Sequence, residues 1–241
     1  GGNDTLWYMA GPDDYVLHMP AYIENIRIAT VVSRKEQDAS QGKEIAVVAH
    51  PDTPMNFETS ERVAVNVHGS RGEDVMIGAK YAGATFYGGA GNDMLIAKSG
   101  RDVLDGGAGD DVIRGGEGRS KIYGGPGNDD ISDGTGGSEI HTGPGRNVVR
   151  SAGGDDHIYV GSGQNLIEPG EGCVVFHVAY GGVTHIKGWH DDYRLDLSEW
   201  PLAPEINVTR KDRADIRLGV SFIRIDGPVS DMQLRAQISQ A

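Results

Sequence analysis

The 241-residue chain contains a single cysteine, Cys173, so no disulfide bond can form within it. Aromatic residues make up only 7% of the sequence, and no stretch approaches the roughly 18 consecutive apolar residues of a membrane-spanning helix. Basic residues are also few: 22 lysines and arginines stand against 35 aspartates and glutamates, a net charge of −13. These deficits exclude a disulfide framework and argue against nucleic acid or an anionic membrane as a partner.

The chain also lacks the short motifs of common catalytic sites, because neither HExxH nor GxSxG occurs and there is no P-loop. His177, His185 and His190 fall close together, but surface or packing roles explain them better than a zinc site does. The acidic pair Asp110-Asp111 lies in a repeat that already accounts for Asp111. We therefore predict that the chain has no catalytic residues and is not an enzyme.

Glycine, by contrast, is abundant and periodic, with 37 residues in the chain. Cutting the sequence every nine residues from Gly88 to His177 gives ten units without a slip, each with glycine at its fourth place. A further unit, 69–77, follows the same pattern, and a ten-residue unit, 78–87, separates it from the others. The eighth place of the ten units is always a large apolar residue: Leu95, Leu104, Ile113, Ile122, Ile131, Ile140, Val149, Ile158, Ile167 and Phe176.

Nine residues are too few for a complete coil of a solenoid, but they suit half a coil, with about six residues of turn and about three of strand. Two successive units would therefore close one flattened coil. Equivalent residues two units apart would then stack directly above one another, at about 4.8 Å. We therefore predict an all-β fold, a parallel β-roll, whose eighth places form two inward-facing apolar ladders and a thin core.

The sixth places of the units form two columns in this arrangement, one on each edge of the roll. One column is Asp74, Asp93, Asp111, Asp129, Asn147 and Asn165, and the other is Ala84, Asp102, Ser120, Ser138, Asp156 and Val174. Successive carboxylates about 5 Å apart would repel one another unless cations lay between them. Glycines allow the turns to aim carbonyl oxygens inward, and carboxylates with carbonyls form the all-oxygen cage that suits Ca²⁺ better than Mg²⁺.

The units resemble the GGxGxDxUx nonapeptide of the RTX (repeats-in-toxin) family. GGAGNDMLI (88–96) and GGAGDDVIR (106–114) match it at every defined place. The segments 14–29, 63–78 and 184–200 are similar to sequences that flank such blocks, so the resemblance covers most of the chain. It implies a calcium-binding β-roll with irregular β coils before it and a capping β region after it.

The resemblance also implies which residues bind calcium. Each ion would lie between the turns of units two apart, held by backbone carbonyls and by the two sixth-place aspartates. On this sequence the first cage is Gly89, Gly91 and Asp93 with Gly106, Ala108 and Asp111. The second is Gly107, Gly109 and Asp111 with Gly124, Pro126 and Asp129, and a third, across the ten-residue unit, is Ser70, Gly72 and Asp74 with Gly88, Ala90 and Asp93.

The opposite edge departs from the family pattern. Asp102 has no carboxylate partner above it, because Ser120 stands where the pattern has aspartate, and Asp156 has only Ser138 and Val174. We expect any sites at Asp102 and Asp156 to be weak, or filled by water and hydrogen bonds. The roll is therefore predicted to bind calcium well on one edge and poorly on the other.

These features divide the chain into three regions. Residues 1–68 are predicted to form N-terminal RTX-like and irregular β coils, residues 69–177 the calcium-binding roll, and residues 178–241 a capping β region that can also hold a secretion signal. Trp189, Trp200 and Phe222 are the apolar residues expected to cover the last coil, since an open edge would aggregate. Three acids near the N-terminus are weaker calcium candidates: Asp4, Asp13 and Asp14.

The resemblance implies a function outside the cell. The expected protein is secreted by type I machinery, is disordered without calcium, and folds on Ca²⁺ binding, which would assist the export and folding of an upstream domain. The chain starts inside a repeat and shows no signal peptide, so we expect it to be a fragment whose catalytic part, if any, lies upstream. The alternatives are a module that binds extracellular polysaccharide, through Arg101, Arg119 and Arg146, and an adhesin that self-associates in calcium.

Overall fold

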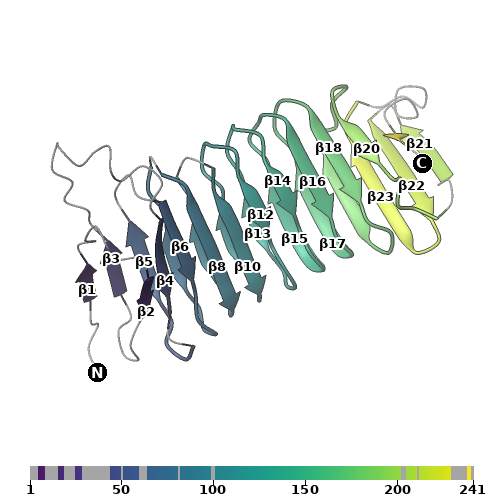
Figure 1. The fold of residues 1–241 in the computed structure, drawn as a ribbon. Coiled ribbons are helices and arrows are strands. Elements are labelled where there is room, and N and C mark those ends of the chain that lie inside the picture. The colour runs from purple at the N-terminus through teal and green to yellow at the C-terminus, as the bar shows by residue number, and fades with distance from the viewer. Residues whose placement is uncertain are drawn as a thin grey trace.

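The structure, a computed structural model, describes residues 5–8, 16–18, 25–28, 44–49, 51–59, 64–80, 82–98, 101–201, 205–210, 212–228 and 238–239. Every regular element within these ranges is a β-strand. The strands follow one another along an elongated molecule, with β1 (Thr5–Tyr8) near one end and β23 (Ser221–Asp226) near the other (Figure 1). The all-β prediction is therefore confirmed.

Successive strands alternate between two sheets, which we call sheet A and sheet B, and each sheet is parallel throughout the stacked coils. Sheet A contains β1, β3 (Asn25–Ile28), β5 (Asn56–Thr59), β7 (Val75–Ile77), β9 (Met94–Ile96), β11 (Val112–Arg114), β13 (Asp130–Ser132), β15 (Gly145–Arg150), β17 (Gly163–Glu168), β19 (Val183–Lys187), β23, β22 (Arg213–Leu218) and β21 (Glu205–Arg210). Sheet B contains β2 (Val16–His18), β4 (Glu44–Val48), β6 (Ala64–His68), β8 (Ala84–Ala90), β10 (Val103–Ala108), β12 (Lys121–Tyr123), β14 (Glu139–His141), β16 (Asp156–Val160), β18 (Val174–Val178), β20 (Arg194–Asp196) and β24 (Ile238–Ser239).

The register of the strands confirms a coil of two nine-residue units. Leu95 on β9 pairs with Ile113 on β11, and Ile113 pairs with Ile131 on β13, so each step within sheet A spans two units of the repeat. Where the ten-residue unit intervenes, Val75 pairs with Met94, so that step is longer by one position. Many of the strands in this region are very short, because the glycine-rich turn takes up the rest of each unit.

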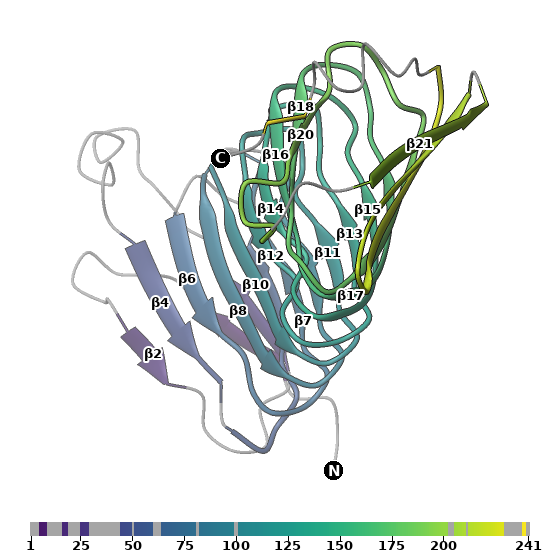
Figure 2. The ribbon, with the colours of Figure 1, turned by 90° about the vertical axis from the view of Figure 1, so that its right-hand side faces the viewer.

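The two sheets lie opposite each other along the roll (Figure 2), and the two predicted apolar ladders form the core between them. All ten eighth-place side chains, from Leu95 to Phe176, are fully buried. Full burial of such a side chain contributes about 1.5–3 kcal/mol, whereas ordering one residue costs about 1–2 kcal/mol in backbone entropy. With two such side chains per two-unit coil, a single coil cannot be stable by itself, and its stability depends on its neighbours and on other contacts.

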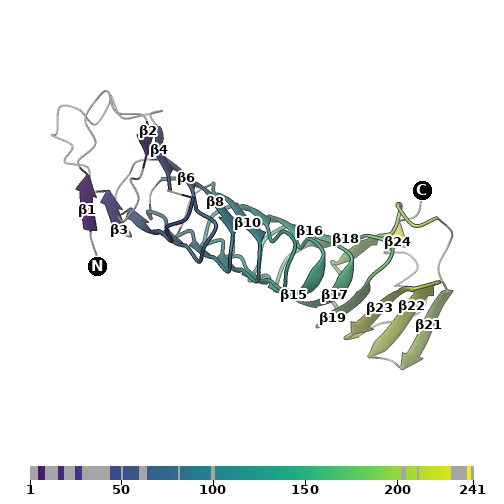
Figure 3. The ribbon, with the colours of Figure 1, turned by 90° about the horizontal axis from the view of Figure 1, so that it is seen from below.

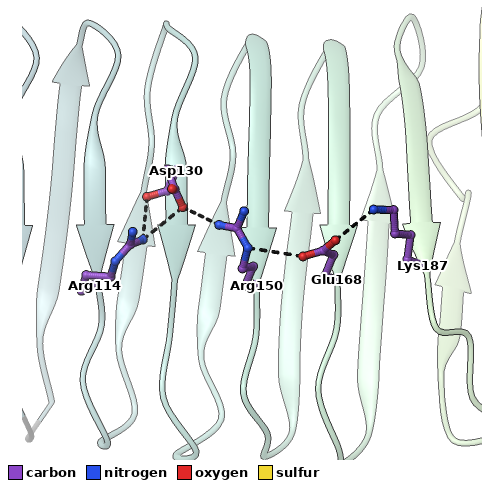
Figure 4. Close-up of polar contacts among 5 residues, drawn as sticks. All are labelled: Arg114, Asp130, Arg150, Glu168 and Lys187. Carbon is purple, nitrogen blue, oxygen red and sulfur yellow. Dashed lines mark hydrogen bonds and ion pairs between the residues drawn. The ribbon is translucent and has the colours of Figure 1, made fainter.

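The outer face of sheet A carries a row of alternating charges that links five coils (Figure 4). Asp130 accepts from both Arg114 (3.1 Å) and Arg150 (2.8 Å), and Glu168 continues the row to Arg150 (3.3 Å) and Lys187 (3.0 Å). These side chains are partly exposed, so each pair contributes only about 0–1 kcal/mol. The row fixes the relative position of neighbouring coils more than it adds to overall stability.

The outer face of sheet B carries a stack of rings instead. Tyr123, His141, Tyr159 and His177 lie at matching places in successive coils, with ring centroids 4.8, 4.3 and 4.3 Å apart. The planes are within 18° of parallel, so the rings stack face to face along the roll. This stack is a direct consequence of the strand spacing, since equivalent residues lie about 4.8 Å apart.

The C-terminal region ends the roll with a change of topology. β23 pairs in parallel with β19 and then forms an antiparallel sheet with β22 and β21, which extends away from the coils (Figure 3). Trp189 and Trp200 are buried there, as predicted, and Trp189 stacks on Phe176 at the end of the core. Phe222 is not an apolar lid, because it is only half-buried and two guanidinium groups lie over its ring, with the Cζ atoms of Arg217 and Arg224 at 4.9 and 5.3 Å from the ring centroid.

Two sequence predictions fall on parts of the chain outside the described residues. Asp4, Asp13 and Asp14, which are possible calcium ligands near the N-terminus, are among them, as is most of the C-terminal segment 229–241. Within the ranges that are described, the structure contains no helix of the length and apolarity needed to cross a membrane.

Candidate calcium site

The sixth-place aspartates of one edge form a continuous hydrogen-bonded column. Oδ1 of Asp111 accepts from the backbone N–H of Asp93 at 2.7 Å, and Oδ1 of Asp129 accepts from the N–H of Asp111 at 3.0 Å. The step from Asp74 to Asp93 is the same, at 2.8 Å, and Asn147 continues the column above Asp129 at 3.0 Å. Each side chain thus ties its own coil to the preceding coil, and the predicted stacking of the carboxylates is correct.

The second oxygen of each of these carboxylates has no such donor. Oδ2 of Asp93, Asp111 and Asp129 is buried and makes no hydrogen bond within the described structure. A buried carboxylate oxygen without a donor is strongly unfavourable unless a cation is present. The column therefore presents a row of unsatisfied acceptors in the interior of the turns.

Backbone carbonyls converge on the same spaces as these oxygens. A Cβ atom placed on Gly88 would lie within 3.0 Å of both Oδ2 of Asp93 and the carbonyl oxygen of Gly106. The same holds one coil later, where a Cβ on Gly106 would meet Oδ2 of Asp111 and the carbonyl of Gly124. Glycine at the first place of the unit thus leaves an open space between a carboxylate oxygen and a carbonyl oxygen. These oxygen atoms belong to the first two predicted cages.

The second and fourth places of these units need glycine for a different reason. Gly107 has a φ of +94° and Gly109 a φ of +140°, and residues other than glycine rarely adopt these backbone angles. A Cβ on Gly107 would also lie within 3.0 Å of the carbonyl oxygen of Gly89 in the preceding coil. The glycine pattern therefore permits both the turn and the close stacking of one turn on the next.

Burial makes the column electrostatically unfavourable in the absence of a cation. It raises the pKa of Asp93 and of Asp129 to about 7 and that of Asp111 to about 6, and neighbouring carboxylates add to the rise. The backbone N–H donors partly offset these shifts. At neutral pH the column thus carries negative charge that the folded protein disfavours, and a divalent cation would compensate for it.

The two asparagines above Asp129 show how the column can do without a cation. The Nδ2 group of Asn147 donates to the carbonyl of Gly143 at 3.1 Å and to Oδ1 of Asn165 at 3.1 Å. Nδ2 of Asn165 donates to the carbonyl of Gly161 at 3.0 Å. An amide donor therefore occupies the position where the aspartates have an unpaired acceptor, so the need for a cation ends at Asp129.

Asp74, at the other end of the column, also has its own donors. Oδ2 accepts from the backbone N–H of Ser70 at 2.6 Å, the Ser70 hydroxyl lies 3.1 Å from both carboxylate oxygens, and Oδ1 accepts from the N–H of Met55. The third predicted cage, around Asp74 and Asp93, therefore has less geometric support than the first two.

On the second edge of the roll, Asp102 and Asp156 keep the same stacking role. Their Oδ1 atoms accept from the N–H groups of Ala84 and Ser138, each at 2.7 Å, and their Oδ2 atoms are buried without a donor. Within its column Asp156 stacks between Ser138 and Val174, as the sequence predicts, but a further acid from outside the column, which the sequence prediction missed, is also close. The carboxylate of Asp133, one coil earlier, lies beside that of Asp156. The side chain of Asp133 comes from a first place, where the family pattern has glycine.

The donor set fits calcium. Carboxylate and carbonyl oxygens surround the spaces next to Gly88 and Gly106, and hard oxygen ligands are those that Ca²⁺ takes. Nowhere in the described ranges do three or more His, Cys, Asp or Glu side chains gather as a metal cluster. His177 and His185 lie on different sheets and pair with different aspartates, Asp196 and Asp226.

Comparison with known families matches the RTX calcium-binding nonapeptide repeat to this chain in four overlapping copies, at residues 87–122, 105–137, 123–158 and 133–167. Residues 87–167 are therefore similar to RTX calcium-binding repeats. The RTX match covers the carboxylate column from Asp93 to Asp129 and the asparagines above it. No curated protein sequence matches the chain.

The RTX repeat is a structural, calcium-binding module rather than a catalytic family, and Ca²⁺ is its cofactor. Asp133 is the functional candidate that the RTX consensus could not identify, because the consensus has glycine at its place. A carboxylate at a first place is nevertheless visible in the sequence, and the position of Gly88 beside Asp93 shows that a first-place side chain points toward the sixth place.

Proposed function

We propose that this chain is a calcium-responsive folding module, which is disordered without calcium and folds into the RTX roll when calcium binds. The observation that carries this proposal is the column of Asp93, Asp111 and Asp129, whose Oδ2 atoms are buried without a donor. Bound calcium would turn this unfavourable column into a source of folding free energy. We propose the first two predicted cages as its main sites and residues 69–177 as the calcium-binding unit.

The thin core supports the same conclusion, because it contributes little folding free energy when calcium is absent. With two large apolar side chains per coil, hydrophobic burial does not offset the entropy of ordering the glycine-rich turns. A chain of this kind, with high negative charge and few aromatic residues, has the composition of a segment that folds only with its ligand.

This switch suits a protein that is exported before it folds. Secretion by type I machinery is typical of RTX proteins, and cytosolic free calcium is low, so we propose that the chain leaves the cell unfolded and folds outside. The C-terminal region, with Trp189 packed on Phe176, would give the last coils a surface on which to form. The folded roll would then assist the folding of an upstream domain of the same polypeptide.

Far-UV circular dichroism tests the proposal directly. Protein freed of calcium with EDTA is expected to lack β-structure, and millimolar CaCl₂ is expected to restore it in a cooperative transition, whereas MgCl₂ at equal concentration is expected to be much less effective. If the calcium-free chain already has the full β spectrum, the switch does not exist.

A specific groove favours binding of an extracellular acidic polysaccharide as a second candidate function. Arg101 and Arg119 occupy the same place in successive coils and line a groove of about 630 Å³, whose other charged residues are Lys121, Asp102, Glu139 and Asp155. Lys121 is paired with Glu139 at 3.0 Å. Within the described part of the chain neither arginine makes an ion pair, whereas Arg146, on the opposite edge, bonds to Gln164 at 2.7 Å. Two unpaired guanidinium groups side by side would be stabilised by an anionic ligand.

Retention of the calcium-loaded chain on an acidic polysaccharide column tests this second function. The double variant R101Q/R119Q is expected to elute earlier than the unaltered protein, and R146Q, which removes an arginine from the other edge, serves as the control. Equal elution of both variants would attribute retention to overall charge and would remove the groove as its cause.

A further inference from the structure

The second edge of the roll contains a pair of carboxylates that the repeat pattern does not account for. Asp156 is a sixth-place residue with a relative exposure of 0%, and its Oδ2 has no hydrogen-bond partner. The carboxylate of Asp133 lies beside it, and Oδ2 of Asp133 is likewise buried without a partner. The two carboxylates thus lie side by side inside the turns, and each has a buried oxygen without a hydrogen-bond partner.

The position of Asp133 in its unit explains how it reaches Asp156. It stands at a first place, and on the same edge a Cβ built on Gly115, the first place two units earlier, would lie 3.4 Å from Oγ of Ser120. A first-place side chain therefore enters the space beside the sixth place. The sixth place of the Asp133 unit is Ser138, so Asp133 supplies from the first place the carboxylate that the sixth place lacks.

The surroundings of the pair are oxygen atoms without a compensating positive charge. The hydroxyl groups of Ser138 and Ser151 lie beside the carboxylates of Asp133 and Asp156, respectively. The remaining oxygens are already used for stacking, since Oδ1 of Asp133 accepts from the N–H of Ala152 at 3.0 Å. No lysine, arginine or histidine in the described ranges forms an ion pair with either carboxylate.

We propose that Asp133 and Asp156, with the hydroxyl groups of Ser138 and Ser151, bind a hard divalent cation on the second edge of the roll. Two carboxylates and two hydroxyls offer only oxygen, as Ca²⁺ requires, whereas softer metals prefer thiolate and imidazole ligands. The site differs from the RTX cages because one of its carboxylates replaces a glycine. This proposal rests on the proposed function in one respect, since the site exists only when the roll has folded in calcium.

Equilibrium dialysis with calcium, which counts the ions bound per chain, tests this site. D133N and D156N are each expected to lose one bound calcium, and the double variant D133N/D156N is expected to lose one rather than two, because both carboxylates belong to the same site. The control is D155N, which removes an exposed negative charge from the adjacent residue and is expected to bind as many ions as the unaltered chain. Unchanged counts in D133N and D156N would overturn the proposal and indicate that the two carboxylates share a proton.

Crystals of the unaltered chain grown in calcium keep the test independent of how the variants fold. Anomalous density is expected between Asp133 and Asp156, as well as in the column from Asp93 to Asp129. Density in the column alone would overturn the second-edge site and leave the calcium-binding roll intact, whereas absence of density from both edges would also contradict the proposed function.

Discussion

The aspartates of the column differ from the asparagines above them by one side-chain heavy atom, an oxygen in place of a nitrogen, and their hydrogen bonding differs accordingly. Asp111 presents an unpaired Oδ2, whereas Asn147 presents an Nδ2 that donates to the carbonyl of Gly143. The same backbone thus supports a position that needs a cation and a position that satisfies itself. The distribution of Asp and Asn along the column therefore determines where calcium is needed.

The substitution D111N should exploit this difference, because Asp111 belongs to both of the best-supported cages. Its new amide is expected to donate to a turn carbonyl, as Asn147 does, so the calcium-free roll should become easier to fold. Calcium affinity measured by isothermal titration calorimetry should fall at least about 10-fold. The neighbouring D110N variant removes the same charge from an exposed fifth place and should bind calcium almost as the unaltered chain does; equal losses in both would argue against a ligand role.

The raised pKa values of the column predict how pH acts on the calcium-free chain. In the folded roll the pKa of Asp93 and of Asp129 is raised to about 7, from an ordinary value of 3.8. The folded state therefore holds more protons than the unfolded state between these pH values, so its stability should fall as the pH rises from about 4 to about 7. Circular dichroism of metal-free protein should show more β-structure at pH 5.5 than at pH 8.

The same protons compete with calcium, so the effect of pH on binding has the opposite sign. Calcium affinity should weaken as the pH falls through about 7, since Asp93 and Asp129 must be ionised to bind the ion. A calcium midpoint that does not change between pH 8 and pH 6 would show that these carboxylates are not ligands.

At the scale of the turn and strand, stacking limits the space for side chains, because each turn lies directly against the turn of the next coil. Gly107 and Gly181 both have a positive φ, +94° and +105°. A Cβ on Gly107 would press on the carbonyl of Gly89, whereas a Cβ on Gly181 would meet nothing within 4 Å. The pair therefore separates the cost of an unusual backbone conformation from the cost of forcing two coils apart.

G181A should lower the thermal midpoint of the calcium-loaded chain only modestly, as expected for about 1–2 kcal/mol of backbone strain. G107A should be far more damaging, because the added methyl group has no space and the glycine lies within a predicted calcium cage. Thermal unfolding followed by circular dichroism in millimolar calcium measures both. Similar midpoints for the two variants would mean that the turns can move apart without penalty.

The sequence was sufficient to predict the elements that repeat. The eighth-place ladder from Leu95 to Phe176 and the longer step at the ten-residue unit follow from spacing alone, because a fixed period leaves one way to stack the coils. Contacts that depend on side-chain direction could not be predicted so easily. The approach of Asp133 to Asp156 needs the knowledge that a first-place side chain points toward the sixth place, which the glycines of the pattern conceal.

At the scale of the whole molecule, the region after the repeats was the hardest to predict. The alternation in 205–226 indicates strands, but it does not specify that β23 joins β19 in parallel and then turns back against β22. The prediction that Phe222 covers the last coil is wrong for this reason, since the face that Phe222 occupies depends on that pairing. Trp189 was assigned correctly because a large apolar residue just beyond the last coil has one available surface, the exposed end of the core.

The position of Trp189 gives a prediction about the molecule as a unit. Its ring stacks on Phe176 with centroids 5.9 Å apart and meets Tyr193 at 5.7 Å, so it closes the end of a core whose coils depend on one another. W189A should cost about 3–5 kcal/mol of folding free energy. Because calcium binding and folding are coupled, this loss should raise the calcium concentration at the folding midpoint, although Trp189 follows β19, three coils beyond the strand that follows Asp129. V220A, at a side chain that is 74% exposed, should leave the midpoint unchanged in the same circular dichroism titration, and an unchanged midpoint for W189A would mean that the column folds independently of the cap.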